Sequence, residues 1–413
     1  MGGEGYTGDL WPGYLSAPVP LYDRIERRPS IFITHLSLTD FRNYPTLELE
    51  LPRGGVVLVG GNAQGKSNLL EAAYMLSIMR SHRAGAEREV ICLGAEGERP
   101  WARVLGRAQG GDDGVEIEVV LQQTAAETVS KRIRVNGVPR RAGEAVGVLT
   151  GVMFSADDIG LLTGPPALRR RYLDITGCQL SGRYLRSLQR YHRVLGQRNG
   201  LLKMVAEGRA RPEELEFWDQ ELVAVGDYIR GQRRVLLQAL NGLARGIHSG
   251  LTHGEEALEL DYRPSPPDTS PEAFARALEE GRGRELALGM TLSGPHRDEL
   301  RFMVNGTDIG IYGSRGQQRT VALSLRLAEA SFLHQDRGQP PVLLLDDVLS
   351  ELDGQRRGQL LRSLASFDQW LLTTTDPSQV APSFLEQSTL FRIQGGTVSP
   401  FPQGGKGAGE DAP

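Results

Sequence analysis

Cysteine is nearly absent from this chain of 413 residues, whose sequence contains Cys92 and Cys178 and no others. Two cysteines cannot form a disulfide framework or a four-cysteine zinc site, so the composition favours a reducing compartment. The sequence also lacks any run of about 18 apolar residues, the length that a membrane-spanning helix requires. Its start shows no basic segment followed by an apolar core, so we do not expect a secretory signal. We therefore predict a cytoplasmic protein with no membrane partner.

An excess of charge of one sign is lacking as well. The chain has 47 basic and 51 acidic residues, which gives a formal net charge of −4. This average gives no indication of a polyanionic partner. Lysine is scarce, since four lysines occur in the whole sequence and almost every basic position carries arginine. Any DNA-binding surface would therefore require local clustering of arginines.

The length predicts two to three packing units of about 150 residues each. Apolar and polar residues alternate over residues 31–38 and 46–51, which is typical of half-buried strands. Residues 167–252 have a nearly continuous helical pattern, and strand and helix patterns alternate on both sides of them. Further strands are expected at 55–59, 256–262, 299–304, 342–345 and 369–374, and a helix at 354–364. Residues 101–140 are expected to form a meander of 101–107, 115–122 and 131–138, with Asn136-Gly137 as a tight-turn signal. This order predicts an α/β head that is split by an inserted helical subdomain.

The pattern divides the chain into five segments. Residues 1–30 are rich in Gly and Pro and are expected to form a flexible arm or to reflect a mis-assigned start site, in preference to a folded element. The head is expected in two parts, residues 31–166 and 256–395, on either side of the helical insertion at 167–255. Residues 396–413 are expected to be a disordered tail.

A phosphate-binding loop is the most specific motif. Its pattern is G-x-x-x-x-G-K-[ST], between an apolar strand and a helix. Glycines let backbone N–H groups surround phosphate oxygens, and the helix N-terminus adds the positive end of its dipole. Lys66 supplies a compact charge for the outer phosphates, and Ser67 supplies a hydroxyl for Mg²⁺. The expected ATP-binding residues of this loop are Gly60, Gly61, Asn62, Ala63, Gln64, Gly65, Lys66, Ser67 and Asn68.

Two carboxylates follow the apolar segment 342–345. We expect Asp346 to hold Mg²⁺ and Asp347 to position or activate the attacking water. Paired aspartates after a buried strand could also cap a helix, but the phosphate loop upstream favours the nucleotide function.

A third motif, Ser314-Arg315-Gly316-Gln317, opens an expected helix before the paired aspartates, and Ser350-Glu351-Leu352-Asp353 follows them. The order of these motifs resembles the signature, Walker B and D-loop of ABC-type ATPases. In that family, the signature of one subunit faces ATP held by the other subunit. The resemblance implies this role for Ser314, Gly316 and Gln317, and it places Asp353 in the D-loop. Lys66, Asp347 and Ser314 are therefore the expected catalytic residues.

Over residues 31–395 the chain resembles the RecF family of bacterial recombination-repair ATPases. The matching segments are 40–44 (DFRNY), 164–166 (GPP), 169–174 (RRRYLD), 197–199 (QRN), 294–298 (GPHRD) and 343–353. The resemblance implies a P-loop head of ABC type, with a mixed sheet, a β meander and a mainly helical lid. It also implies ATP and Mg²⁺ as cofactors and an ATP-driven homodimer that clamps DNA. The expected DNA is double-stranded as well as single-stranded or gapped, and it is bound without sequence preference.

The partners and the rate of hydrolysis also follow from the resemblance. It implies that the protein favours RecA loading with RecR and RecO, and that it is a weak, DNA-stimulated ATPase. Asp347 stands where transport ATPases have glutamate, and no histidine follows residues 373–376; both features indicate slow hydrolysis. Ala156 replaces the proline expected before Asp157 and Asp158, which affects the shape of that loop. The alternatives are a transport- or translation-linked ABC ATPase and an SMC-like chromosome-organising protein, which would need hundreds of heptad residues.

The sequence leaves two interpretations open for the role of each of four further residues. Arg42 is included among the expected ATP-binding residues by the resemblance, although it could be a solvated turn residue. Arg80 and Arg83 could contact nucleotide or DNA, or they could cap the negative end of the helix after the loop. His296 could sense nucleotide or have a structural role.

Overall fold

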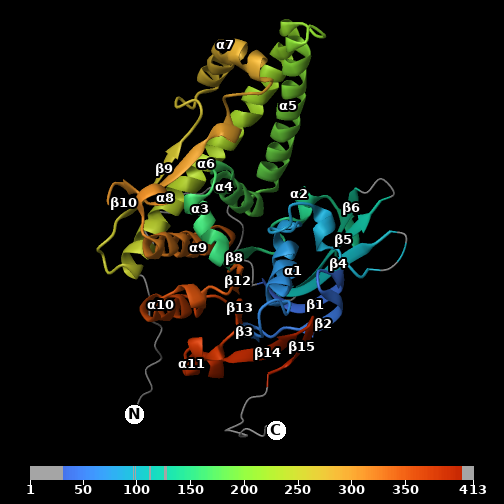
Figure 1. The fold of residues 1–413 in the computed structure, drawn as a ribbon, viewed down its shortest axis with the longest axis vertical. Coiled ribbons are helices and arrows are strands. Elements are labelled where there is room, and N and C mark those ends of the chain that lie inside the picture. Colours follow the sequence, from blue (N-terminus) through green and yellow to red (C-terminus); the bar gives the residue numbers. More distant parts are fainter. Residues whose placement is uncertain (1–30, 96, 98, 111–112, 125–127, 402–413) are drawn as a thin grey trace, which may run out of the picture.

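The computed structural model describes residues 31–401 except 96, 98, 111–112 and 125–127, so the expected N-terminal arm and residues 402–413 lie outside it. A head of sheets and helices forms one end of the molecule, and a helical subdomain projects from it (Figure 1). Among the described helices, none combines the length and apolarity that crossing a membrane requires.

The central sheet of the head has the expected mixed topology. Within the described residues its order is β15-β14-β3-β13-β12-β8, with β15 antiparallel to β14 and the other neighbours parallel. Its strands are β3 (Gly54–Val59), β8 (Gly151–Ser155), β12 (Val342–Asp346), β13 (Gln369–Thr374), β14 (Ser388–Gln394) and β15 (Thr397–Pro400). The continuous apolar runs of β3 and β12 follow from burial on both faces of the sheet, and all six residues of β13 are buried as well.

An antiparallel meander forms a second sheet, with the order β2-β1-β4-β5-β6-β7 among the described residues. Its strands are β1 (Ile31–Phe41), β2 (Tyr44–Glu50), β4 (Trp101–Gly110), β5 (Asp113–Gln123), β6 (Val129–Val135) and β7 (Val138–Arg140). The tight turn expected at Asn136-Gly137 within residues 131–138 is confirmed. Asn136 and Gly137 both have positive φ and form the turn between β6 and β7. Helix α1 (Lys66–Ile78) packs between the two sheets, with Leu69, Leu70 and Leu76 in their shared apolar cluster.

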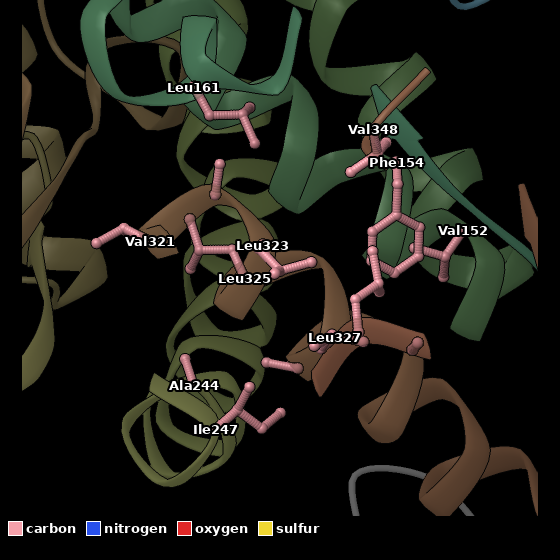
Figure 2. Packing of buried hydrophobic residues seen from close by; sticks show 14 of the residues in the cluster. Val152, Phe154, Leu161, Ala244, Ile247, Val321, Leu323, Leu325, Leu327 and Val348 are labelled. Carbon is pink, nitrogen blue, oxygen red and sulfur yellow. The ribbon is translucent and has the colours of Figure 1, made fainter. Parts of the chain in front are cut away.

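The other face of the central sheet packs against helices. They are the long α6 (Leu215–Leu251), α9 (Arg315–Arg337) and α10 (Gly354–Leu364). Figure 2 shows Leu323 and Leu325 of α9 in this cluster, with Ala244 and Ile247 of α6 on one side and Phe154 of β8 on the other. A third sheet, with the order β11-β10-β9 in the described part of the chain, lies beside α6. Its strands are β9 (Leu258–Arg263), β10 (Glu299–Val304) and β11 (Thr307–Asp308).

The helical subdomain contains the expected helices and one more. The expected helices are α4 (Pro166–Leu180), α5 (Gly182–Ala206) and most of α6. Helix α7 (Pro271–Leu288) falls in the segment expected to be the second part of the head, yet it packs against α5 and α6 (Figure 1). Its Phe274 and Leu278 complete the apolar cluster of those helices. The helical subdomain is therefore discontinuous in sequence, and the expected boundary at residue 255 is corrected.

The start that we predict for the disordered tail, residue 396, is too early. Residues 397–400 form β15, whose pairing with β14 includes Phe391 opposite Pro400 and Ile393 opposite Val398. The rest of that tail, residues 402–413, lies outside the described residues. The remaining short helices are α2 (Ala142–Ala145), α3 (Gly160–Thr163), α8 (Ile309–Tyr312) and α11 (Pro382–Glu386).

Candidate nucleotide-binding site

The phosphate loop joins β3 to α1, and Gly65 is the N-cap of the helix. Its φ is +116°, and a Cβ at this position would lie 2.6 Å from Asn43 Nδ2 and 2.8 Å from the Tyr44 hydroxyl. Only glycine fits here. The same two residues hold the loop: Tyr44 Oη donates to the Gly65 carbonyl oxygen (3.0 Å), and Asn43 Nδ2 donates to that of Gln64 (3.1 Å). The turn between β1 and β2 is thus part of the site.

A second hairpin holds the loop from another side. Gly395, in the turn between β14 and β15, donates its N–H to Gln64 Oε1 at 2.7 Å. Gly396 donates its N–H to the Gln64 carbonyl oxygen at 3.1 Å. Gly60 lies against the Ile393 carbonyl oxygen, which a Cβ would approach to 2.3 Å. The conformation of the loop is therefore set by two hairpins that lie far apart in the sequence.

Lys66 lies inside the loop, with 7% of its surface exposed. Its Nζ donates to the carbonyl oxygens of Gly60 and Gly61, both at 2.7 Å. Burial lowers the pKa of Lys66, while the nearby carboxylates of Asp347 and Asp346 act in the opposite direction. A cation held this close to the loop backbone can bind the outer phosphates of a nucleotide.

The residues expected to hold Mg²⁺ meet at the end of β12. Asp346 Oδ1 accepts hydrogen bonds from Ser67 Oγ at 2.7 Å and from Thr373 Oγ1 at 3.0 Å. No group of three or more His, Cys, Asp or Glu side chains that could hold a metal ion occurs among the described residues. One carboxylate and one hydroxyl fit Mg²⁺, which is commonly bound through one or two protein oxygens together with substrate phosphates.

Asp347 follows in the left-handed backbone region, with φ of +52°. Its N–H donates to Thr373 Oγ1 at 2.9 Å, and Ser350 Oγ donates to its carbonyl oxygen at 2.8 Å. Thr373 therefore orients both aspartates, a role that the sequence analysis missed. Burial raises the pKa of Asp347, and the positive charge of Lys66 opposes this effect. A carboxylate of raised pKa is suited to accept a proton from water.

These groups line one cavity of about 210 Å³. The lining residues are Asn62, Ala63, Gly65, Lys66, Ser67, Asn68, Arg83, Asp346 and Asp347. Arg83 Nη1 donates a hydrogen bond to Asn68 Oδ1 at 3.4 Å. Arg83 does not cap α1, whose C-cap is Met79. Of the two interpretations left open for Arg83, its position therefore favours the nucleotide contact.

Arg42 is not among the residues that line this cavity. Its Nη2 and Nε donate to the Glu71 carboxylate at 2.8 and 3.1 Å, and its Nη1 donates to the Glu89 carbonyl oxygen at 2.7 Å. Glu71 lies on α1 and is 0% exposed, so its charge needs a paired cation. The structure therefore places Arg42 in an ion pair with Glu71, which replaces the alternative of a solvated turn residue, while its contact with ATP stays a prediction.

The signature residues lie outside the phosphate cavity of their own chain. Ser314 is the N-cap of α9 and accepts from the Gln317 N–H at 3.2 Å, while Gln317 Oε1 accepts from the Ser314 N–H at 3.0 Å. Ser314 and Gly316 are exposed. Asp353 of the expected D-loop caps α10 by accepting from the Arg356 N–H at 2.9 Å. One chain alone therefore does not bring its signature to its phosphate loop.

A second cavity, of about 530 Å³, lies where the end of α1 meets α4 and α5. Its lining includes Arg80, Arg170 and Arg171. Arg170 Nη1 donates to the Asp298 carbonyl oxygen at 2.8 Å, and Arg171 Nη2 donates to that of His82 at 2.9 Å. Burial lowers the pKa of both guanidinium groups, and neighbouring arginines lower it further. Across the described residues, these three arginines form no ion pair.

His296 also borders this second cavity, but both of its ring nitrogens have partners. Nδ1 lies 2.7 Å from the Tyr191 hydroxyl, and Nε2 lies 3.1 Å from the Thr291 carbonyl oxygen. Burial lowers the pKa of His296 to about 4. Of the two interpretations, the structural role is the one supported.

Comparison with known proteins identifies similar chains along almost the whole length. The family described as RecF/RecN/SMC N terminal domain matches residues 32–396. The DNA replication and repair protein RecF of Herpetosiphon aurantiacus is 43% identical over 384 residues, which cover 90% of this chain and 100% of that protein. The RecF of Bacillus subtilis is 37% identical over 89% of this chain and 100% of that protein.

Solved structures that are similar to this chain also include RecF. The recombination mediator protein RecF with ATP, from the RecFOR pathway, has a TM-score of 0.82 and 31% identity, and covers 92% of this chain and 100% of that chain. The Smc head domain of Pyrococcus furiosus has a TM-score of 0.50 and 17% identity over 89% of this chain and 95% of that chain. The second likeness concerns the fold alone.

Proposed function

The chain belongs to the RecF family of DNA replication and repair proteins, and from this premise we propose that two copies close over two ATP molecules to clamp DNA at gaps and junctions. The clamp favours RecA loading together with RecR and RecO, and slow ATP hydrolysis releases it. One observation carries the proposal. Each chain has a complete phosphate cavity and an exposed signature that lies outside it.

The phosphate cavity supplies the groups that ATP binding requires. Lys66 and the loop N–H groups bind the outer phosphates, and Arg83 adds a second positive charge at the edge of the cavity. Ser67 and Asp346 would hold Mg²⁺ through oxygen atoms that already lie 2.7 Å apart. When bound, Mg²⁺ neutralises charge on the phosphate oxygens.

Asp347 is the proposed base. Its backbone is fixed through the Thr373 hydroxyl, and the pKa of its carboxyl group is raised by burial. It accepts a proton from the attacking water and orients that water toward the phosphate. Its side chain is one methylene shorter than glutamate, which supports slow turnover.

The surface around the signature supports contact with a second subunit. Ile311 and Tyr312 of α8 stand immediately before it and are 67% and 75% exposed. Apolar side chains this exposed, beside an exposed helix N-terminus, are suited to burial in an interface. ATP would then be bound between the loop of one subunit and Ser314 of the other.

The arginines of the second cavity are the proposed DNA-binding residues. Arg80, Arg170 and Arg171 form no ion pair among the described residues, although the carboxylates of Glu299, Asp298 and Asp174 act on Arg170 from a distance. The charge of Arg80 lowers the pKa of Arg171, so these two guanidinium groups lie near each other. DNA phosphates would compensate these charges. Because such contacts involve the backbone and no base edge, they give little sequence preference.

Sedimentation with ATP, with ADP and without nucleotide, each with and without gapped DNA, tests the proposal. We expect a dimer with ATP that DNA stabilises, and a monomer in the other conditions. An equal fraction of dimer in ATP and ADP would contradict the proposed switch.

A further inference from the structure

A chain of hydrogen bonds joins the signature to the end of the long helix α6. Gln317 Nε2 donates to Glu256 Oε1 at 2.8 Å, and Glu256 Oε2 lies 3.0 Å from His248 Nε2. His248, near the end of α6, is fully buried, and its Nδ1 lies 3.0 Å from Ser324 Oγ on α9. We name the three residues His248, Glu256 and Gln317 the α6 relay.

The α6 relay fixes the orientation of the Gln317 amide. Its Oε1 accepts from the Ser314 N–H at 3.0 Å, while its Nε2 is held by Glu256. An amide that accepts at one end and donates at the other cannot be flipped without losing both bonds. Glu256 therefore determines that oxygen, and not nitrogen, faces the signature serine.

The buried end of the α6 relay is satisfied. Ser324 Oγ is placed to donate to the Thr320 carbonyl oxygen at 2.7 Å, in which case His248 Nδ1 donates to Ser324. If Ser324 donates to Nδ1 instead, neutral His248 carries its proton on Nε2. With the proton on Nε2, His248 donates to Glu256 Oε2; with the proton on Nδ1, that bond needs one further proton, on the ring or on the carboxyl group. The Glu256 carboxyl group is thus hydrogen-bonded through both oxygens, and it is held to α6.

We propose that the α6 relay positions the signature serine for the ATP of the other subunit, with Glu256 and His248 as positioning residues. This inference rests on the proposed composite site. Because α6 continues from the head into the helical subdomain, a change in the orientation of that subdomain would reach Ser314 through His248 (Figure 1).

Three variants separate the relay from a general structural role. Glu256→Gln keeps both hydrogen bonds when His248 carries its proton on Nδ1, because its amide oxygen accepts from Gln317 and its amide nitrogen then donates to His248 Nε2. Gln317→Glu keeps the bond to the Ser314 N–H, as in a capping box, but it places a second carboxylate against Glu256. The double variant Gln317→Glu/Glu256→Gln restores a donor opposite the new carboxylate.

The readouts are ATP affinity of the monomer, the dimer dissociation constant in ATP, and amide hydrogen exchange of residues 313–318 in the monomer. Gln317→Glu should weaken dimerisation by about tenfold or more, since a hydrogen bond to a charged group is lost, and should leave monomer ATP affinity unchanged. The exchange rate at residues 313–318 should rise. Glu256→Gln and the double variant should be close to the unmodified chain. Glu259→Gln, on an exposed position of β9, is the matched control.

The inference would be overturned if Gln317→Glu dimerised and exchanged its amide hydrogens like the unmodified chain. It would also be overturned if the double variant dimerised no more tightly than Gln317→Glu. A Glu256→Gln variant as impaired as Gln317→Glu would overturn it too. If the unmodified chain does not dimerise with ATP, the proposed function fails, and hydrogen exchange in the monomer still decides whether the relay holds Ser314.

Discussion

Replacing Arg42 with methionine should mainly destabilise the head. The substitution removes the two hydrogen bonds of 2.8 and 3.1 Å that the guanidinium makes to Glu71, a side chain with 0% exposure. Breaking a buried pair by removing one partner costs about 3–5 kcal/mol, because the other charge stays buried and unpaired. Arg83, 3.9 Å from Glu71, and the Ser81 hydroxyl would remain, which favours the lower end, about 3 kcal/mol.

Urea unfolding and ATP titration measure the two effects separately. We expect Arg42→Met to lower the unfolding free energy by about 3 kcal/mol, and ATP affinity at low denaturant to change little. The double variant Arg42→Met/Glu71→Gln removes the buried charge as well, and it should recover most of the lost stability. Unchanged stability together with a loss of ATP affinity would refute this reasoning and return Arg42 to the nucleotide site.

The remaining predictions concern the nucleotide site and the second cavity. Lys66→Ala should abolish ATP binding in a nucleotide titration while circular dichroism stays native, because the lost charge is the one inside the loop; near-normal affinity would contradict the phosphate-loop assignment. Ser314→Arg should bind ATP normally but show neither an ATP-induced dimer in sedimentation nor hydrolysis. Asp347→Asn should trap a long-lived ATP dimer. In the unmodified chain, the rate of hydrolysis should fall as the pH falls. Because burial raises the pKa of Asp347, this fall should begin at a higher pH than for an ordinary aspartate. Arg171→Ala should weaken DNA binding uniformly across sequences, and reduce the slope of log affinity against log salt by about one.

The phosphate loop and the paired aspartates could be predicted from the sequence because each is a short local pattern. Residues 60–67 and the apolar run that ends at Asp346 carry their own signals in spacing and composition. Helix α7 also had a start signal, since Ser270 caps it and Pro271 is its first residue, but its charged sequence lacks a clear apolar stripe.

The supports of the site could not be predicted in the same way, because they depend on contacts between distant segments. Nothing near Gln64 indicates that Gly395 and Gly396 donate to it. Nothing near Arg42 indicates a carboxylate partner on α1. Thr373 was visible only as a residue of a buried strand, and its role at both aspartates follows from the pairing of β12 with β13.

The position of β3 has a consequence for the order in which the protein can fold during synthesis. This strand leads directly into the phosphate loop, yet its two neighbours, β13 and β14, come from the last part of the chain. The hairpin that fixes Gln64 comes later still, with Gly396 at its turn. In a nascent chain, β3 therefore lacks its neighbouring strands, and the loop at 60–67 lacks its second hairpin, until β13, β14 and Gly396 have left the ribosome. ATP cannot stabilise the growing chain, and binding competence arises in a single late event.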